Sequence, residues 1–240
     1  MTQGIDVNKI MAYPASVSIL CVGKEWFPEV SGGLNRYVYE LGLQLAAGDD
    51  QVELCLAGAA KPMPNANITL THLTSSKERL PKLLWVARQQ FAKRSIQLPD
   101  AINLHFALYS FPLLKSLPKD ISVTFTFHGP WAAESEREGQ HSLGTLAKRW
   151  LEQQVYQRCD RFIVLSKAFG EILHREYRIP WEQIFIIPGG VDIQHFQQTL
   201  TRQQARGKLQ WHRVALSCSH PVDRPISGRM PSSAPPMPPL

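Results

Sequence analysis

The stretch that decides the fold reads Val17-Ser18-Ile19-Leu20-Cys21-Val22, then Ser31-Gly32-Gly33, then Leu34-Asn35-Arg36-Tyr37-Val38-Tyr39-Glu40-Leu41. The segment 17–22 is apolar enough for a buried strand. The later residues Leu34, Tyr37, Val38, Leu41 and Leu45 recur at the spacing of a helix. A helix is therefore predicted to begin directly after the paired glycines. Glycine lets bare backbone N–H groups approach a ligand, and a helix N-terminus favours an anion such as a phosphate or diphosphate. The start of the chain thus predicts an anion-binding loop at a strand-to-helix junction.

The composition is that of an ordinary soluble globular protein. Of the 240 residues, 44% are hydrophobic and 19% are charged. The polar segment Met1 to Met11 has no apolar core run, so no signal peptide is expected, and no stretch approaches the roughly 18 apolar residues of a membrane span. The four cysteines contain no CxxC pair, which favours buried reduced thiols over a metal site or disulfides: Cys21, Cys55, Cys159 and Cys218. These features predict a cytoplasmic location.

The net charge of +6 comes from the end of the chain. Residues 1–192 hold 20 basic and 19 acidic residues, whereas residues 193–240 hold 6 basic residues and one acid, Asp223. The body of the chain has no stripe in which basic and aromatic residues alternate. We therefore expect no nucleic-acid partner.

Strand and helix patterns alternate along the chain. Strands are expected over 17–22, 52–56, 68–73 (an edge strand), 101–105, 121–127, 161–165 and 184–187. Helices are expected over 33–47, 80–96, 143–156 and 167–177, a helix or turn over 106–115, and a polar helix over 201–210. Over 143–156 the apolar residues lie along one face of the expected helix: Leu143, Leu146, Ala147, Trp150, Leu151 and Val155. This alternation predicts an α/β fold, a Rossmann-like parallel sheet with helices on both faces, whose ligands bind at the carboxyl ends of the strands.

Polar and glycine-containing segments follow several of the expected strands. His128-Gly129-Pro130-Trp131 follows the strand over 121–127, Ser166 follows 161–165, and Pro188-Gly189-Gly190-Val191-Asp192 follows 184–187. Taken singly, each has a structural explanation: a tight turn at Gly32-Gly33, a satisfied core histidine, an N-cap serine, or a loop. Their joint position at strand ends favours a binding site, because independent structural needs would scatter them.

Four segments together resemble a known family. In this order and spacing, FPEVSGGLNRYVYELGLQLA (27–46), TFHGPW (126–131), RCDRFIVLSKAF (158–169) and IFIIPGGVDIQHF (184–196) are similar to the N-terminal half of a family-four retaining glycosyltransferase of the GT-B fold. The resemblance covers about residues 17–197. It implies two facing Rossmann-like domains, of which the N-terminal one mainly holds the acceptor and the C-terminal one the nucleotide-sugar.

The resemblance also implies roles for individual residues. Gly32 and Gly33 match the loop that approaches the donor diphosphate through backbone N–H groups, and His128 matches the histidine beside the donor sugar. Ser166 matches a serine near the cleft, at the start of a helix. The segment before the second domain supplies Gly190 and Asp192 at the cleft edge, and the residue before them, Gly189, stands where asparagine is usual.

The acceptor side and the cofactors are less defined. Residues that would line the acceptor pocket are Glu25, Arg36 and Trp131, of which the first two can equally be surface charges. No Asp-x-Asp pair or histidine cluster implies a metal, and no cofactor is expected beyond the nucleotide-sugar substrate. Contact with a membrane surface is a tendency of the family, but no strongly basic amphipathic helix supports it here.

The end of the chain departs from the family. The expected divisions are an extension over 1–16, the Rossmann-like acceptor domain over 17–197, a linker helix over 198–211 and a disordered or frame-shifted tail over 212–240. Seven of the last 20 residues are proline, and no strand pattern follows His212. We therefore expect a truncated glycosyltransferase with little or no activity alone, the frame changing near Trp211 or the gene ending naturally.

Two functions other than glycosyl transfer are considered for this sequence. The chain is alternatively a non-catalytic binding module, or a subunit that pairs with a separately encoded C-terminal domain. A nicotinamide-dependent oxidoreductase would need G-x-G-x-x-G directly after the first strand. Gly23-Lys24-Glu25-Trp26-Phe27-Pro28 stands there instead, so that function is not expected.

Overall fold

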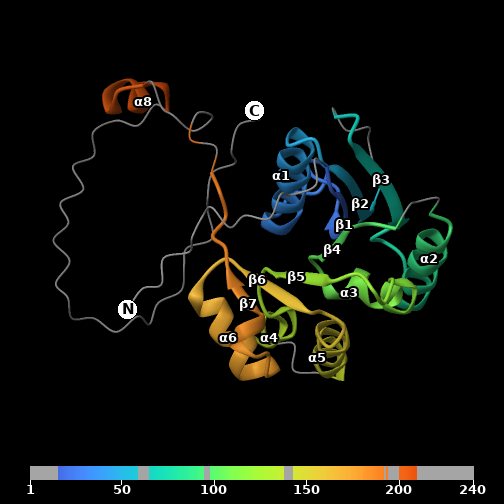
Figure 1. Cartoon of the computed structure of the whole chain (residues 1–240). Coiled ribbons are helices and arrows are strands. Elements are labelled where there is room, and N and C mark those ends of the chain that lie inside the picture. Colours follow the sequence, from blue (N-terminus) through green and yellow to red (C-terminus); the bar gives the residue numbers. More distant parts are fainter. Residues whose placement is uncertain are drawn as a thin grey trace, which may run out of the picture. The chain divides into compact units, whose positions relative to one another are not determined.

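Seven parallel strands form one sheet in the computed structural model, which describes residues 16–58, 65–94, 98–137, 143–191, 193 and 200–209. The strands are β1 (Ser18–Glu25), β2 (Gln51–Ala57), β3 (Ile68–Thr74), β4 (Ala101–Leu104), β5 (Val123–Phe127), β6 (Arg161–Val164) and β7 (Ile184–Ile186). Their order is β3-β2-β1-β4-β5-β6-β7 (Figure 1). The chain therefore leaves β1 toward one edge and returns through β4 on its other side. This reversal makes the β1–β4 boundary the switch point, where α/β sheets bind ligands.

Helices connect the strands, as the alternating pattern predicts. They are α1 (Gly33–Ala47), α2 (Leu80–Ala92), α3 (Ala107–Ser110), the 3-10 helix η2 (Phe111–Ser116), α4 (Trp131–Arg137), α5 (Leu143–Tyr156), α6 (Lys167–Tyr177), the 3-10 helix η3 (Trp181–Gln183) and α8 (Arg202–Lys208). The predicted bounds of α1, α5 and α6 agree with the structure. The helix expected over 80–96 ends at Ala92, and residues 95–97 lie outside the described part.

Two hydrophobic clusters lie on opposite faces of the sheet. Leu20 and Val22 of β1 belong to the larger cluster, with residues of α2, α3, α5 and α6, whereas Cys21 belongs to the smaller cluster, with Val38 and Ala46 of α1. Successive side chains of a strand point to opposite faces, so this division shows helices on both. The prediction of a Rossmann-like parallel sheet is confirmed.

The face of α1 that packs on the sheet combines part of the expected apolar stripe with small residues. Its fully buried residues are Asn35, Val38, Gly42 and Ala46, while Leu34 and Leu45 of the expected stripe are partly buried against the smaller cluster. A Cβ on Gly42 would lie 3.2 Å from Leu54 Cδ1. The small residues therefore let α1 lie close against β2.

Only part of the apolar face of α5 is buried. Leu143, Leu146 and Trp150 are 86%, 65% and 52% exposed. The buried residues are Thr145, Leu151, Glu152, Val155 and Tyr156, of which Leu151 and Val155 belong to the expected apolar face. Short α4 was not predicted either, since its seven residues, WAAESER, show no apolar period. Packing of α5 beside α4 directs Glu152 into the core and rotates the leucines outward.

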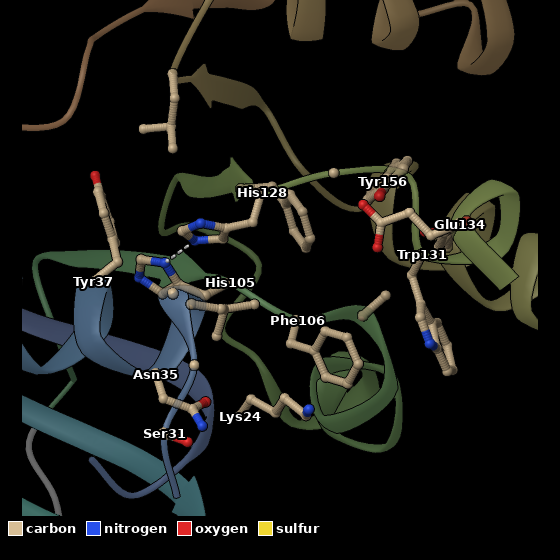
Figure 2. A pocket seen from close by; sticks show the side chains of 18 residues that line it. Lys24, Ser31, Asn35, Tyr37, His105, Phe106, His128, Trp131, Glu134 and Tyr156 are labelled. Carbon is tan, nitrogen blue, oxygen red and sulfur yellow. Dashed lines mark hydrogen bonds between the residues drawn. The ribbon is translucent and has the colours of Figure 1, made fainter. Parts of the chain in front are cut away.

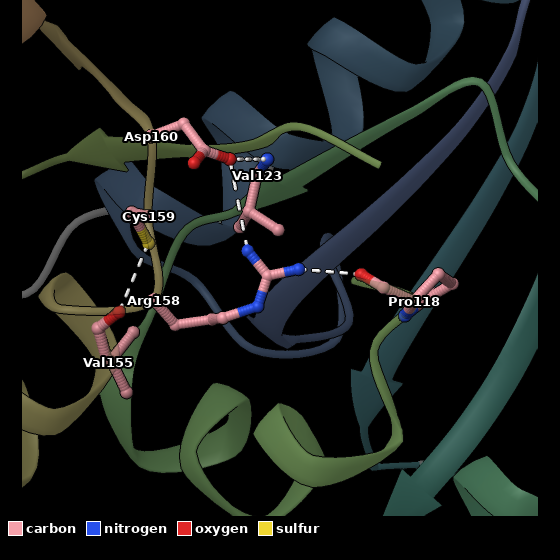
Figure 3. Close-up of polar contacts among 6 residues, drawn as sticks. All are labelled: Pro118, Val123, Val155, Arg158, Cys159 and Asp160. Carbon is pink, nitrogen blue, oxygen red and sulfur yellow. Dashed lines mark hydrogen bonds and ion pairs between the residues drawn. The ribbon is translucent and has the colours of Figure 1, made fainter. Parts of the chain in front are cut away.

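A polar network fixes the turn between α5 and β6 (Figure 3). Arg158 donates to the carbonyl oxygen of Pro118 at 2.6 Å, and its guanidinium lies 3.8 Å from Asp160 Oδ2. Asp160 Oδ2 also accepts from the backbone N–H of Val123 at 2.8 Å. Since Val123 begins β5 and Arg161 begins β6, this network belongs to the amino ends of the strands, away from the expected ligand side.

The described residues fall into two compact units divided between Gly190 and Val191. The second unit contains α8, which begins with a capping box formed by Thr201 and Gln204. This short helix agrees with the polar helix expected over 201–210. Asp192 and residues 210–240, including the expected tail, lie outside the described residues, and the predicted domain limits remain predictions.

Candidate functional site

A pocket of about 510 Å³ lies at the carboxyl ends of the central strands, within the first unit. Its walls come from the end of β1, the start of α1, and the segments that follow β4, β5 and β6 (Figure 2). It therefore opens at the β1–β4 switch point. This position is where the parallel sheet was expected to bind a ligand.

The glycine loop forms one wall of the pocket. Gly32 is the N-cap of α1 with φ of 154° and no side-chain cap, so the first backbone N–H groups of the helix lack a side-chain partner from the cap. Nothing lies within 4 Å of a Cβ placed on Gly33. Uncapped N–H groups at the positive end of a 15-residue helix can bind an anion.

Asn35 holds this loop against β1. Its Nδ2 donates to the carbonyl oxygen of Val30 at 3.1 Å, and its Oδ1 accepts from the backbone N–H of Glu25 at 3.1 Å. The Asn35 side chain is only 3% exposed. Its amide therefore fixes the loop independently of any ligand.

Two histidines meet in the lining of the pocket, beside Tyr37 of α1. Nδ1 of His105 lies 3.3 Å from Nε2 of His128, and Tyr37 packs edge-on against the His128 ring at 4.9 Å between centroids (Figure 2). Burial lowers the pKa of His128 to about 4. Burial, with the neighbouring His128, also holds the pKa of His105 well below its usual range. Both imidazoles are therefore neutral at pH 7, and each can donate one hydrogen bond and accept another.

Aromatic rings and a lysine line a further part of the pocket. Phe106 and Trp131 lie 5.2 Å apart between ring centroids. The ammonium of Lys24 lies 5.7 Å from the centre of the Phe106 ring, and that of Lys148 lies 5.2 Å from the Trp131 ring. Aromatic faces beside polar groups suit a ligand that has both apolar and hydroxylated surfaces, such as a sugar.

Glu152 reaches the pocket from α5. Its carboxylate accepts a hydrogen bond from the Tyr177 hydroxyl at 2.7 Å, and backbone hydrogen bonds join it to Trp131 and Ala132 at the start of α4. Burial outweighs these bonds and raises the pKa of Glu152 to about 7. The side chain thus connects the segment after β5 to α5 and α6.

Four of the residues expected from the sequence line this pocket together: Gly32, Gly33, His128 and Trp131. Ser166 is instead the N-cap of α6, where its Oγ accepts from the backbone N–H of Phe169 at 3.3 Å. It does not line the pocket. The roles implied by the family resemblance remain predictions for all five.

The other expected residues lie elsewhere. Glu25 and Arg36 do not line the pocket: the Glu25 carboxylate lies 3.5 Å from Lys24 Nζ, and Arg36 lies 3.7 Å from Glu40 on the exposed side of α1. Gly190 is exposed after β7 and is not a lining residue. Asp192 lies outside the described residues.

Sequence reasoning missed His105, Asn35, Tyr37 and Glu152. His105 directly follows β4, so its position at a strand end was an available signal. Asn35 and Tyr37 lie in the first turns of α1, where Tyr37 contributed to the helical spacing but neither residue carried a local signal for a place in the pocket. For Glu152 no local signal existed, because a glutamate within an amphipathic helix is ordinarily exposed.

Neither a metal-binding cluster nor a membrane-crossing helix occurs among the described residues. Within them, no group of three or more His, Cys, Asp or Glu side chains is arranged to hold a metal ion. No helix in that part of the chain combines the length and hydropathy needed to cross a membrane.

The sequence matches a family model. The model of Glycosyltransferase Family 4 matches residues 31–195, which include the glycine loop, His128 and Ser166. A search of the curated proteins found no match.

Solved structures share the fold at low sequence identity. Sucrose-phosphate synthase from Thermosynechococcus elongatus is 20% identical with a TM-score of 0.61, over 80% of this chain and 52% of that one. A glycosyltransferase from Rickettsia africae ESF-5 is 16% identical with a TM-score of 0.52, over 83% and 51%. The catalytic domain of Starch Synthase IV from Arabidopsis thaliana, bound to ADP and acarbose, is 14% identical with a TM-score of 0.51, over 75% and 53%. The chain thus spans about half the length of these structures.

Proposed function

Because the chain belongs to Glycosyltransferase Family 4, we propose that its pocket takes part in glycosyl transfer from a nucleotide-sugar to an acceptor, with retention at the anomeric carbon. The observation that supports this most directly is the meeting of two features in one pocket. The uncapped start of α1 at Gly32-Gly33 suits a diphosphate, and the neutral His128 suits a sugar hydroxyl. The aromatic pair Phe106 and Trp131 then suits the remaining sugar surface.

The chemistry needs charge stabilisation more than a protein nucleophile. As the glycosidic bond to the diphosphate breaks, negative charge develops on the leaving phosphate oxygen. Backbone N–H groups at Gly33 and the positive end of α1 would stabilise that charge in fixed geometry. His128, neutral at pH 7, would hydrogen-bond a sugar hydroxyl without adding a charge of its own. No metal or cofactor is part of this proposal.

The described Rossmann-like domain would supply one side of the reaction site. The family resemblance implies that a second domain contacts most of the nucleotide, and this chain spans about half the length of its structural relatives. We therefore expect little or no transfer by this chain alone. A second domain, in a longer chain or a separate one, would complete the donor site.

The test is a Gly33→Ala substitution, with nucleotide binding as the readout. A methyl group there meets no protein atom within 4 Å, so it should leave the fold intact and occupy the space of the ligand instead. We expect UDP, ADP or GDP, whichever the wild-type chain binds, to bind at least about tenfold more weakly, as for a lost charge-assisted hydrogen bond. Isothermal titration calorimetry measures the affinity, and a thermal melt checks that the variant is folded.

Gly207→Ala is the matched control. Gly207 lies in α8, and a Cβ on it also meets nothing within 4 Å. The Gly207→Ala variant should bind the nucleotide with the affinity of the wild type. If Gly33→Ala also binds like the wild type, the glycine loop does not hold the diphosphate. If the nucleotide and its sugar bind but no transfer follows when a second domain is supplied, the chain is a non-catalytic binding module.

A further inference from the structure

We propose that His105 is a positioning residue that fixes the tautomer of His128, so that His128 presents its Nδ1–H group to the ligand in the pocket. The inference rests on the proposed function only for the identity of that ligand, a nucleotide-sugar. The pairing of the two rings stands on the structure itself. Nothing in the local sequence assigned a role to His105.

The backbone brings the two histidines together from different strands. His105 follows β4 and His128 follows β5, two parallel neighbours whose register pairs Leu104 with Phe125. The backbone N–H of His105 also donates to the carbonyl oxygen of Val22 in β1 at 2.9 Å. The His105 side chain is 2% exposed. Its ring is therefore held in place by the centre of the sheet, whereas His128 borders the pocket.

The contact between the rings allows only two proton arrangements. At 3.3 Å, Nδ1 of His105 and Nε2 of His128 share one hydrogen bond between two neutral imidazoles. In the first arrangement His105 donates, which leaves the proton of His128 on Nδ1. In the second His128 donates from Nε2, which leaves its Nδ1 as a bare acceptor. The partner of one ring nitrogen thus determines the chemistry of the other.

Burial favours the first arrangement. Nε2 of His105 is buried and has no hydrogen-bond partner among the described residues. If His105 accepted through Nδ1, its proton would lie on Nε2, as a buried N–H group without an acceptor. Buried N–H groups without a partner are rarer in proteins than buried acceptors without one. Donation from Nδ1 of His105 leaves only a lone pair at that position.

The ligand also favours the first arrangement. Nδ1 of His128 has no partner in the described part of the chain and is not among its fully buried unpaired atoms. His128 lines a pocket that also contains the positive end of α1, which favours anionic or oxygen-rich groups. An N–H donor on His128 would complement such a ligand, whereas a bare nitrogen would oppose a phosphate oxygen. Because free imidazole side chains favour the Nε2–H form, the Nδ1–H form needs His105 to hold it.

The test is the ¹⁵N spectrum of the histidine rings at pH 7.5 in the full chain without ligand, with His128→Asn used to assign the signal. We expect His128 in the wild type to be protonated at Nδ1 and bare at Nε2. In His105→Phe the partner is lost, and His128 should shift toward the Nε2–H form. In His105→Asn an amide N–H can take the place of the Nδ1 donor, so His128 should keep its proton on Nδ1.

An Nε2–H signal for His128 in the wild type, or an unchanged tautomer in His105→Phe, overturns the proposal. If the phenylalanine variant does not fold, the wild-type spectrum and the asparagine variant still decide it. The link to function is measured separately, with UDP-glucose and UDP as probes. His105→Phe should weaken UDP-glucose about three- to tenfold more than UDP, as for one neutral hydrogen bond. If neither probe binds the wild type, a uridine nucleotide-sugar is not the donor, while the tautomer result stands.

Discussion

Glu152 places a carboxyl group in the core of the domain, where it organises a wall of the pocket. The side chain is 1% exposed and joins the start of α4 to Tyr177 of α6. Because burial is the largest influence, its pKa rises from 4.5 to about 7. The folded state therefore holds this proton more tightly than the unfolded state between those two values.

The expected consequence is a stability that depends on pH through Glu152. The group contributes its full stability below its unfolded pKa of 4.5, and that contribution is lost as pH rises through about 7. In Glu152→Gln this loss should disappear. The free energy of unfolding of the wild type relative to the variant should fall by about 3 kcal/mol between pH 4.5 and 8, at 1.36 kcal/mol per pKa unit.

Urea unfolding of both proteins across this pH range measures the difference. The lowered pKa values of His105 and His128 act in the opposite sense, reducing stability as pH falls below about 6.5. Both proteins contain these histidines, so their effect cancels in the comparison. A difference that stays constant with pH would mean that Glu152 does not titrate in this range.

Among elements, α5 shows how far a helical period can mislead. The bounds Leu143–Tyr156 follow from the sequence, but the helix buries a face that is offset from its apolar stripe. Trp150 still packs against Phe111 of η2, at 5.4 Å between ring centroids, while Leu146 remains 65% exposed. Apolar residues at helical spacing thus identified the helix, and packing against neighbouring elements determined which of its faces is buried.

Two matched substitutions in α5 test this assignment. Leu151 is 7% exposed, so Leu151→Ala should lower the free energy of unfolding by about 2–5 kcal/mol through a cavity. Leu146→Ala makes the same chemical change on the exposed face and should alter it by no more than about 0.5 kcal/mol. Chemical denaturation of both variants measures the values. Equal losses for the two leucines would restore the buried face expected from the sequence.

For the molecule as a whole, the sheet protects thiols that lie in different parts of the chain. Cys21 in β1, Cys55 in β2 and Cys159 before β6 are all buried and free. Burial raises the pKa of each thiol, that of Cys21 to about 12. The thiolate is the reactive form of cysteine. Each thiol is therefore protected twice: burial keeps reagents away from the sulfur, and the raised pKa keeps it protonated.

We therefore expect these thiols to react only when the domain opens. Iodoacetamide at pH 8 should leave the three cysteines unmodified in the native protein over a time in which the urea-unfolded chain reacts completely. Peptide mass spectrometry follows each position separately, which matters because Cys218 lies outside the described residues. Rapid native labelling of Cys21 or Cys55 would show that the centre of the sheet opens locally.

The sequence by itself determined the order of the strands and longer helices and part of the site. Alternating strands and helices, the glycines before α1 and the position of His128 after β5 all follow from local patterns of a few residues. Those patterns predicted a parallel sheet with a ligand at its carboxyl edge, and Gly32, Gly33, His128 and Trp131 do line one pocket there.

Only the tertiary structure decided which side chains meet. His105 and His128 are 23 residues apart and touch because β4 and β5 are parallel neighbours in register, which no local period records. Glu152 is buried where α5 packs beside α4 and its carboxylate meets Tyr177 of α6, whereas Glu25 and Arg36 lie outside the pocket, beside Lys24 and Glu40. The spacing of apolar residues along the chain determines whether a segment forms a strand or a helix. Contacts between elements depend on strand order, register and helix rotation, and these are settled by packing across the whole domain.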